Sequence, residues 1–457
     1  TDKKLLALLA AIIFAVHPIH TEAVSNITGL SEVLTSFFAL FAIWLYSKSK
    51  KLDVYYISSL LCYLFAILSK ENGIVALGVI ILLDVCNNWL NLSKLKSKLF
   101  YYGGYFFVLF SYLLLKINLR GSIINNKNLI FLDSFSSRIY TMSLVFIKYI
   151  CLLVFPNKLI AFYDTTIIKI VNQFNVEVIL ALILIFALLI TGVILLWYQR
   201  LIAFSILFFF CTMSVVSNVF FDICVIMAER FLYFPSISVC LIFGAIFYWL
   251  INHSSKLKII GVCLFTLVCL LATVRTYIRN LDWLTQDSVR TSFISNAPQS
   301  PRIALMLYDR ALELFDEGKV NEAITVNKEL TTKFPNYAQG HYQLGKILHS
   351  VNKYQEALPY LARAKQLTPQ DEEISLAYAL ALLNNGIVEE AKIELESLIK
   401  ENPNLVEANN YLGIVYLNLQ LYTQARKQFE ITLKINPNYK PAELNLIKLQ
   451  EIISNTN

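Results

Sequence analysis

Long apolar runs separated by short polar stretches fill the first 280 residues of the chain. After a first run at 5–16 they lie at about 31–47, 54–69, 73–90, 99–117, 138–156, 177–198, 201–219, 231–250 and 258–276. Each is close to the ~20 residues that a helix needs to cross the hydrocarbon core of a bilayer. A helix also satisfies its backbone hydrogen bonds internally, as that core demands. The pattern predicts a multi-pass transmembrane helical domain over residues 1–280.

The remaining third of the chain repeats itself every 34 residues. Prolines recur at this step, and so do alanines: Pro301, Pro335, Pro369, Pro403 and Pro437, with Ala323, Ala357, Ala391 and Ala425. Thirty-four residues is the period of the tetratricopeptide repeat, a pair of helices. We therefore predict an all-α fold, in which a linker at 281–301 leads to an α-solenoid at 302–457. The solenoid has four tetratricopeptide repeats over 302–437 and a capping helix at 438–453.

Stacked repeats form a concave surface that commonly binds a peptide or protein. The alternative is that these repeats only brace the membrane domain. The two parts of the chain also differ in charge, because 22 of the 39 Lys and Arg but only 11 of the 32 Asp and Glu lie before residue 281. A basic excess on membrane segments marks cytoplasmic loops. With no basic stripe in the repeats, it argues against nucleic acid as a partner.

The basic clusters predict the topology. They should all face the cytoplasm: Lys3-Lys4, Lys48/Lys50/Lys51, Lys94/Lys96/Lys98, Arg200 and Lys256/Lys258. Strict alternation would leave Arg200 outside if residues 138–156 crossed. We therefore interpret 138–156 as a re-entrant or interfacial segment whose ends share one side, which places Asn126 and Asn172 both outside. Nine crossings remain, so the repeats are expected on the extracytoplasmic side.

The stretch HPIHTEAVSNITGLSE, between two apolar runs, brings His17, His20, Glu22 and Glu32 to the outer membrane surface. Other charged groups fall on the same side: Lys70 and Glu71 in LSKENG, Glu229 and Arg230 in MAERFLYFP, and also Asp164 and Asp222. Charges at membrane depth are costly and often mark a substrate path. The simpler alternatives are histidines bonded to carbonyls or carboxylates, and local ion pairs between adjacent residues. A zinc site is disfavoured, because no third ligand has suitable spacing.

Four motifs in the same order resemble one family of enzymes. FAVHPIHTEAVSNITG, LSKENGIVALGVIILLD, AERFLYFPS and RNLDW, followed by tetratricopeptide repeats, resemble the repeat-bearing C-type membrane glycosyltransferases, which include the transmembrane and tetratricopeptide-repeat O-mannosyltransferases. The chain departs from the family where an arginine and an acid usually follow the glycine, since Gly29 is followed here by Leu30, Ser31 and Glu32. Members of this family transfer a sugar from a polyprenyl-phosphate (dolichyl-phosphate) carrier to an acceptor outside the cytoplasm.

The resemblance implies a role for each charged motif. A departing lipid phosphate needs a cation, for which we expect Arg230 first and Lys70 second, because the planar guanidinium holds two oxygens. Glu229 and Glu71 would orient these cations. His17, His20 and Glu22 would shape the sugar and acceptor pocket, and a lipid groove would be lined by Phe231, Tyr233 and Phe234. No metal ligand is assigned, and the need for a divalent metal is left open.

The function expected from the sequence is transfer of mannose or a similar hexose to a protein hydroxyl, with the repeats recruiting the acceptor. The alternative is a membrane-anchored repeat scaffold without catalysis. The chain opens with Thr1, and we expect an upstream segment to carry the family's acidic loop and general base, so that these 457 residues alone would be inactive. Four repeats favour a bacterial inner membrane over the endoplasmic reticulum.

Overall fold

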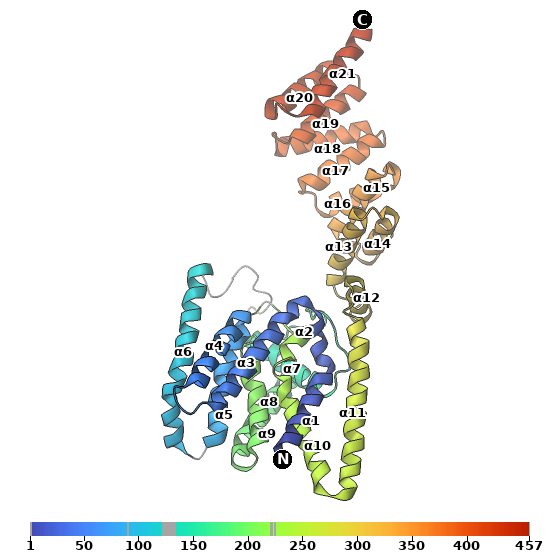
Figure 1. Cartoon of the computed structure of the whole chain (residues 1–457). Helices are drawn as coiled ribbons and strands as arrows, with labels where there is room; N and C mark the ends of the chain where they lie inside the picture. Colours follow the sequence, from blue (N-terminus) through green and yellow to red (C-terminus); the bar gives the residue numbers. More distant parts are fainter. Residues whose placement is uncertain (1, 89–90, 121–133, 220–222, 224, 457) are drawn as a thin grey trace. The chain divides into compact units, whose positions relative to one another are not determined.

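The computed structural model describes residues 2–88, 91–120, 134–219, 223 and 225–456, in two compact units. Unit 1 is Thr1–Ser300 and unit 2 is Pro301–Asn457, and the position of one relative to the other is not determined (Figure 1). The described residues form helices and no strand, apart from one isolated antiparallel bridge between Tyr163 and Met227. The predicted all-α fold is confirmed. Asn126 and Asp222 lie outside the described residues.

Unit 1 is a bundle of long helices interrupted by short 3-10 turns. The long helices are α1 (Asp2–Val16), α3 (Leu30–Lys48), α4 (Val54–Ser69), α5 (Val75–Asn88), α6 (Leu92–Arg120), α7 (Phe135–Val154), α8 (Val176–Tyr198), α9 (Arg200–Met213), α10 (Ser236–His253) and α11 (Ser255–Leu281). The short elements are η1 (Pro18–His20), α2 (Thr21–Ser25), η2 (Ile27–Gly29), η3 (Glu71–Ile74), η5 (Glu229–Leu232) and α12 (Gln286–Asn296). Residues 281–301, predicted as a linker, thus contain α12 and belong to unit 1 as far as Ser300.

Among the described residues, seven helices are long and apolar enough to cross a membrane, or eight if the bent pair Lys3–Val16 and Pro18–Ser25 is one span. The helices α4 and α9 are apolar but shorter. Unit 1 is therefore a multi-pass membrane domain, as predicted. The short elements η1, α2 and η5 contact one another, and η3 contacts α3, so all of them gather at one end of the bundle. We call this the motif end.

The opposite end of the bundle holds the connections that carry the basic clusters. The guanidinium of Arg200 at the start of α9 donates to the carbonyl of Asn87, at the end of α5. Since α5 begins beside η3 at the motif end, α5 and α8 both run from the motif end to the basic end. Successive helices then alternate in direction, and α11 returns the chain to the motif end before α12.

Helix α7 has both of its ends at the motif end. Near its start, the Ser137 hydroxyl donates to Asn172, three residues before the Asn175 N-cap of α8. At its other end, the Leu153 carbonyl contacts the His17 imidazole 3.0 Å away, just after α1. Residues 155–175 thus run back alongside α7. By length and composition α7 is one of the seven helices that could cross a membrane, so its interfacial placement stays a prediction, which the position of its two ends favours. The return is made by the irregular residues after α7, because α7 itself is unbroken.

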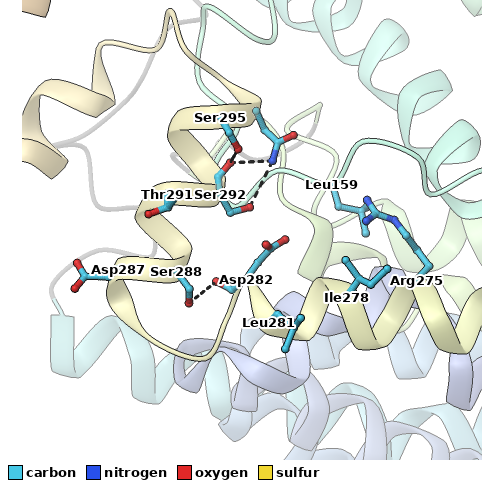
Figure 2. Close-up of a pocket in the computed structure, with 11 residues that line it drawn as sticks. Leu159, Arg275, Ile278, Leu281, Asp282, Asp287, Ser288, Thr291, Ser292 and Ser295 are labelled. Carbon is cyan, nitrogen blue, oxygen red and sulfur yellow. Dashed lines mark hydrogen bonds between the residues drawn. The ribbon is translucent and has the colours of Figure 1, made fainter.

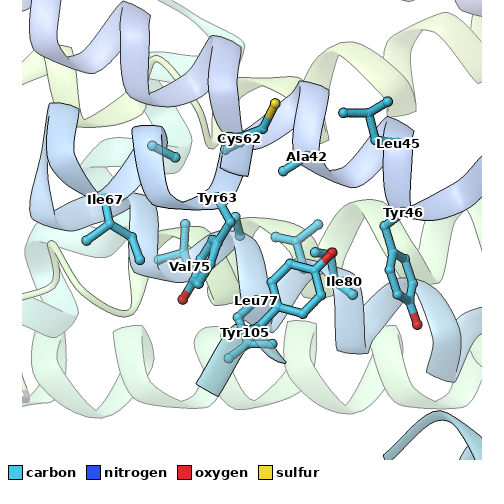
Figure 3. Packing of buried hydrophobic residues seen from close by; sticks show 14 of the residues in the cluster. Ala42, Leu45, Tyr46, Cys62, Tyr63, Ile67, Val75, Leu77, Ile80 and Tyr105 are labelled. Atoms are coloured by element: carbon cyan, nitrogen blue, oxygen red, sulfur yellow. The ribbon is translucent and has the colours of Figure 1, made fainter. Parts of the chain in front are cut away.

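Nonpolar side chains from α3, α4, α5 and α6 form the main core of unit 1 (Figure 3). Figure 3 shows Tyr63 and Tyr105 among residues such as Ile67, Val75 and Ile80. Polar groups inside this core are bonded: the Ser59 hydroxyl donates to the Ala42 carbonyl at 2.6 Å, and the buried Asp84 carboxylate accepts from the hydroxyls of Tyr46 and Tyr102. Because buried polar groups are costly when unpaired, these bonds hold α3, α5 and α6 in one register.

Unit 2 consists of antiparallel helix pairs. The pairs are α13 (Arg302–Asp316) with α14 (Val320–Lys333), α15 (Ala338–Ser350) with α16 (Tyr354–Leu367), α17 (Glu372–Asn384) with α18 (Val388–Glu401), and α19 (Val406–Asn418) with α20 (Tyr422–Ile435), followed by α21 (Lys440–Thr456). The helices α13, α15, α17, α19 and α21 each contact the next of this series, so they form the inner face of the stack. The period-34 alanines are buried between the helices.

Small residues let the two helices of a repeat pack closely. A Cβ atom built on Gly345 in α15 would lie 2.4 Å from Leu361 Cγ in α16. We predict that Gly345→Val destabilises unit 2 by about 1–3 kcal/mol, because overpacking forces the helices apart. Thermal unfolding followed by circular dichroism would measure it. Gly103→Val in α6 is the control, since a Cβ there meets nothing within 4 Å. Equal midpoints for the two variants would contradict the prediction.

Candidate active site at the motif end

Helix α1 ends at Val16, and the chain then reverses its direction through three short helical elements, η1, α2 and η2. The His17 side chain caps η1 by accepting from the Ile19 amide, and Pro18 occupies the first helical turn, where its missing N–H costs nothing. Asn26 caps η2 in the same way. At Gly29 a Cβ would lie 2.4 Å from the Ala23 carbonyl oxygen, so only glycine permits this approach of η2 to α2. These features place Glu22 inside the bundle.

Glu22 and Arg230 form the central ion pair of the site. The Glu22 carboxylate is 1% exposed, and it accepts from Arg230 Nη1 at 2.5 Å and from the Arg230 backbone amide at 2.9 Å. The Arg230 side chain remains 21% exposed. Because a guanidinium has five N–H donors, the pair with Glu22 leaves nitrogen donors for another anion. Arg230 is thus a fixed cation that is partly open to the surface of the bundle.

Glu229 faces away from Arg230 and belongs to a second, fully buried pair. Its carboxylate accepts from the Ile160 amide at 2.5 Å and from the Tyr163 hydroxyl at 2.9 Å, and it lies 3.5 Å from Arg279 Nη2. Arg279 is only 1% exposed and also donates to Asp282 at 2.8 Å. Burial raises the pKa of the Glu229 carboxyl to about 7, while the Arg279 guanidinium lowers it. The pair ties η5 and residues 160–163 to the end of α11.

Lys70 approaches the same aromatic ring as Arg230. Its ammonium binds Glu32 in α3 at 2.5 Å, and Asn72 donates to the same carboxylate at 3.2 Å. Both cations lie near the ring of Phe231, whose centroid is 5.5 Å from Lys70 Nζ and 5.4 Å from Arg230 Cζ. Glu71 points elsewhere and binds Lys116 of α6 at 2.7 Å. Two cations from separate motifs therefore meet at Phe231.

The two histidines lie beside this cluster. The His20 imidazole contacts the Ser236 hydroxyl at 2.8 Å, and its ring packs against Phe14 and Tyr233 at 4.3 and 4.9 Å between centroids. The His17 ring lies 5.6 Å from that of His20. Both imidazoles are buried and bonded to oxygen atoms of the protein, which is the simpler of the two interpretations of the sequence. Among the described residues no group of three His, Cys, Asp or Glu side chains could hold a metal ion.

The pairing of charges differs from the one expected from the motifs. Glu229 and Glu71 were expected to orient Arg230 and Lys70, but Glu22 and Glu32 bind these cations instead. The reason is geometric, because side chains of adjacent residues in a helical turn point in different directions and cannot face each other. Glu22, predicted for the sugar and acceptor pocket, is thus the partner of Arg230. Asp164 lies apart from the cluster, where its carboxylate accepts from the Ser300 hydroxyl and the Thr166 amide.

Arg279 is the site residue that reasoning from the sequence did not single out. It stands first in the RNLDW motif, and the available signal was an arginine in the last turn of an apolar helix with an aspartate three residues later. Asp282 also lines an open cavity of about 600 Å³ between α11 and α12 (Figure 2). Figure 2 shows Arg275 and Ile278 on the α11 wall and Ser288, Thr291 and Ser295 on the α12 wall. The cavity thus adjoins the Glu229–Arg279 pair.

The architecture and the site define a class of protein: a multi-pass helical membrane protein with charged residues gathered at one end, which carries tetratricopeptide repeats. Family models described as "Tetratricopeptide repeat" match residues 308–372 and 348–410. In a solved structure titled "Crystal structure of YrrB: a TPR protein with an unusual peptide-binding site", 84% of that chain aligns with 38% of this one, at 21% identity and a TM-score of 0.32.

The chain is homologous to protein O-mannosyl-transferases over nearly its whole length. It is 27% identical to "Protein O-mannosyl-transferase TMTC3" of Mus musculus over an alignment 493 positions long, which covers 97% of this chain and 51% of the relative. It is 29% identical to "Protein O-mannosyl-transferase F38B6.6" of Caenorhabditis elegans, over 70% of this chain and 44% of the relative. The chain spans about half the length of the curated relatives it matches. The resemblance seen in the motifs is confirmed.

Proposed function

We propose that this protein transfers a hexose, mannose or a similar sugar, from a polyprenyl-phosphate (dolichyl-phosphate) carrier to a protein hydroxyl on the extracytoplasmic side. The observation that carries the proposal is the partly exposed Arg230 guanidinium, held by the buried Glu22 at the motif end. A departing lipid phosphate needs a preorganised cation, and a guanidinium fixed by a buried carboxylate cannot turn away from it. The names of the relatives support the reaction type.

The other side chains receive roles from their contacts. Lys70 is the second cation, held by Glu32 and sharing the Phe231 ring with Arg230. Glu229 acts at a distance, because with Arg279 it fixes η5 and so the position of Arg230. His17 and His20 fix the reversal of the chain that carries Glu22. Phe231, Tyr233 and Phe234 are proposed to line the path of the lipid. Unit 2 is proposed to recruit the acceptor protein.

The direct test is transfer from a lipid-linked sugar. Membranes that contain the full-length protein, given radiolabelled polyprenyl-phosphate mannose, should place label on protein in a linkage that alkaline β-elimination releases. Membranes without the protein are the control. A folded protein that transfers no sugar, from mannose or other hexose carriers, would support the alternative of a membrane-anchored repeat scaffold.

The side on which the repeats lie can be predicted from the directions of the helices. With α7 not crossing, and with the shorter apolar helices α4 and α9 counted as spans beside the longer ones, nine described helices would cross, and α11 would bring the chain to the motif end, opposite the basic clusters. In a variant without native cysteines, Asn352→Cys should react with an impermeant thiol reagent from the extracytoplasmic side. Ser49→Cys, beside Lys48 and Lys50, should be protected. Labelling of Ser49→Cys alone would reverse the proposed orientation.

A further inference from the structure

Lys148 of α7 is a cation that the proposed mechanism does not use. Its ammonium lies 5.1 Å from the centroid of the Tyr163 ring, and in the described parts of the chain it has no carboxylate within 4 Å. Arg230, Lys70 and Arg279 are each bound to a carboxylate at the same end of the bundle. A half-buried ammonium without a neighbouring carboxylate is costly unless another anion compensates it. The Lys148 ammonium is therefore available to bind an anion that does not belong to the chain.

The ammonium opens into a cavity of about 640 Å³ between α7 and the chain that returns along it. One face of α7 forms one wall, with Thr141, Leu144, Val145 and Lys148 at helical spacing, and residues 167–173 form the other. The Thr141 hydroxyl fixes the two walls by accepting from the Val171 amide at 2.9 Å. Lys169 adds a second cation to the lining, against the single carboxylate of Glu177. The cavity thus has a mixed polar and nonpolar lining with a net positive charge.

A nonpolar groove begins next to this cavity and follows α8. It is lined by Phe174, which precedes the N-cap of α8, and by one stripe of that helix: Ile179, Leu182, Ile183, Phe186, Ala187 and Ile190. Phe174 lies between Gln173 and Asn175, which both line the Lys148 cavity, and its ring packs on Tyr140 of α7 at 5.5 Å. From Ile179 to Ile190 the helix rises by roughly 17 Å, more than half the thickness of the hydrocarbon core. Cavity and groove therefore lead from the membrane surface into the bilayer.

We propose that the Lys148 cavity and the α8 groove together bind an isoprenoid lipid phosphate, with its phosphate on Lys148 and its chain along α8. The groove favours one chain over the two chains of a phospholipid, because a single stripe of one helix lines it. Lys148 lies against the Tyr163 ring, whose hydroxyl donates to Glu229, and the cavity that Lys148 lines does not include Arg230, so this position is distinct from the Arg230 cation. The inference rests on the proposed function, since it identifies the bound lipid as the carrier held before or after transfer.

The test measures lipid binding without any sugar transfer. The full-length protein in phosphatidylcholine nanodiscs is titrated with undecaprenyl phosphate, and the bound lipid is counted by native mass spectrometry. Lys148→Gln should weaken binding about tenfold, which corresponds to the loss of one charge-assisted contact. Lys148→Arg should retain binding, because it keeps the charge. Ile183→Trp should also weaken binding by filling the groove, while it stays compatible with the membrane.

Lys158→Gln is the matched control, since Lys158 is an exposed lysine of the same returning segment and does not line the cavity. Wild-type affinity in Lys148→Gln would overturn the proposal. Equal binding of phosphatidic acid would overturn its isoprenoid part and assign the site to phospholipids in general. A wild-type protein that binds the lipid at Lys148 but transfers no sugar would refute the proposed function alone. Transfer without such binding would refute this inference alone.

Discussion

Replacing Arg230 by lysine is expected to reduce sugar transfer on the order of 100-fold, the usual cost of losing one preorganised donor at a developing charge. In the structure Arg230 uses Nη1 for Glu22, and the rest of its planar fork is left for a phosphate. A lysine would present a single ammonium to both anions, so neutralising Glu22 would come at the expense of the phosphate. Transfer from lipid-linked sugar, in membranes with equal amounts of variant and wild-type protein, measures the effect.

The control for this prediction is Arg275→Lys. Arg275 lies in α11 at the same end of the bundle, where its guanidinium donates, within the described part of the chain, to the carbonyl oxygens of Pro156 and Asn157 and to no carboxylate. We expect this variant to keep most of its activity. Both variants should insert into membranes and retain the repeats, as shown by their yield and resistance to proteolysis. Wild-type transfer by Arg230→Lys would make Arg230 a structural partner of Glu22 and remove it from the reaction.

Replacing Arg279 by methionine is expected to lower the free energy of unfolding of unit 1 by about 3–5 kcal/mol. The substitution leaves the Glu229 carboxylate, which is fully buried, without its cation. Asp282 is 32% exposed at its side chain and can be solvated, so most of the cost falls on Glu229. Thermal unfolding of the purified protein in detergent, followed by tryptophan fluorescence, measures the change.

A second substitution separates the charge effect from the loss of packing. Glu229→Gln together with Arg279→Met removes both charges, and we expect it to recover a large part of the stability lost in Arg279→Met. Arg275→Met, one turn earlier in α11, should cost much less, since the partners of Arg275 among the described residues are backbone carbonyls. If Arg279→Met unfolds at the wild-type temperature, the buried pair does not stabilise the motif end, and the argument that Glu229 positions η5 fails.

Several features of the site followed from local patterns. Pro18 and Gly29 lie where the chain turns sharply or where backbones approach closely, and their effect depends on neighbours in the chain. The placement of His17, Glu22, Lys70 and Arg230 at one end followed from counting apolar runs. Which carboxylate binds which cation did not follow, because Glu22 and Arg230 are 208 residues apart and only the packing of η1 and η5 brings them together.

The segment around α7 also has features that the sequence predicted and features that only the tertiary structure shows. Charge alternation already indicated that 138–156 begins and ends on one side, since basic residues avoid translocation regardless of how helices pack. Charge alternation could not show that α7 is one unbroken helix. The chain returns along α7 through residues 155–175, which lack a hydrophobic periodicity and are held by single hydrogen bonds such as that from Ser137 to Asn172.

The sequence by itself determined the all-α class, the apolar spans, the 34-residue repeats and the family resemblance, since each rests on hydrophobic periodicity or on short motifs. These signals are local, and they arise from the requirement that each helix bury its nonpolar face or match the bilayer. Only the tertiary structure decided the partners of Arg230, Lys70 and Glu229, the importance of Arg279, and the position of Lys148 away from any carboxylate of the described residues. Such contacts depend on the summed packing of distant segments, and a charge selects its partner by position in space rather than by position in the chain.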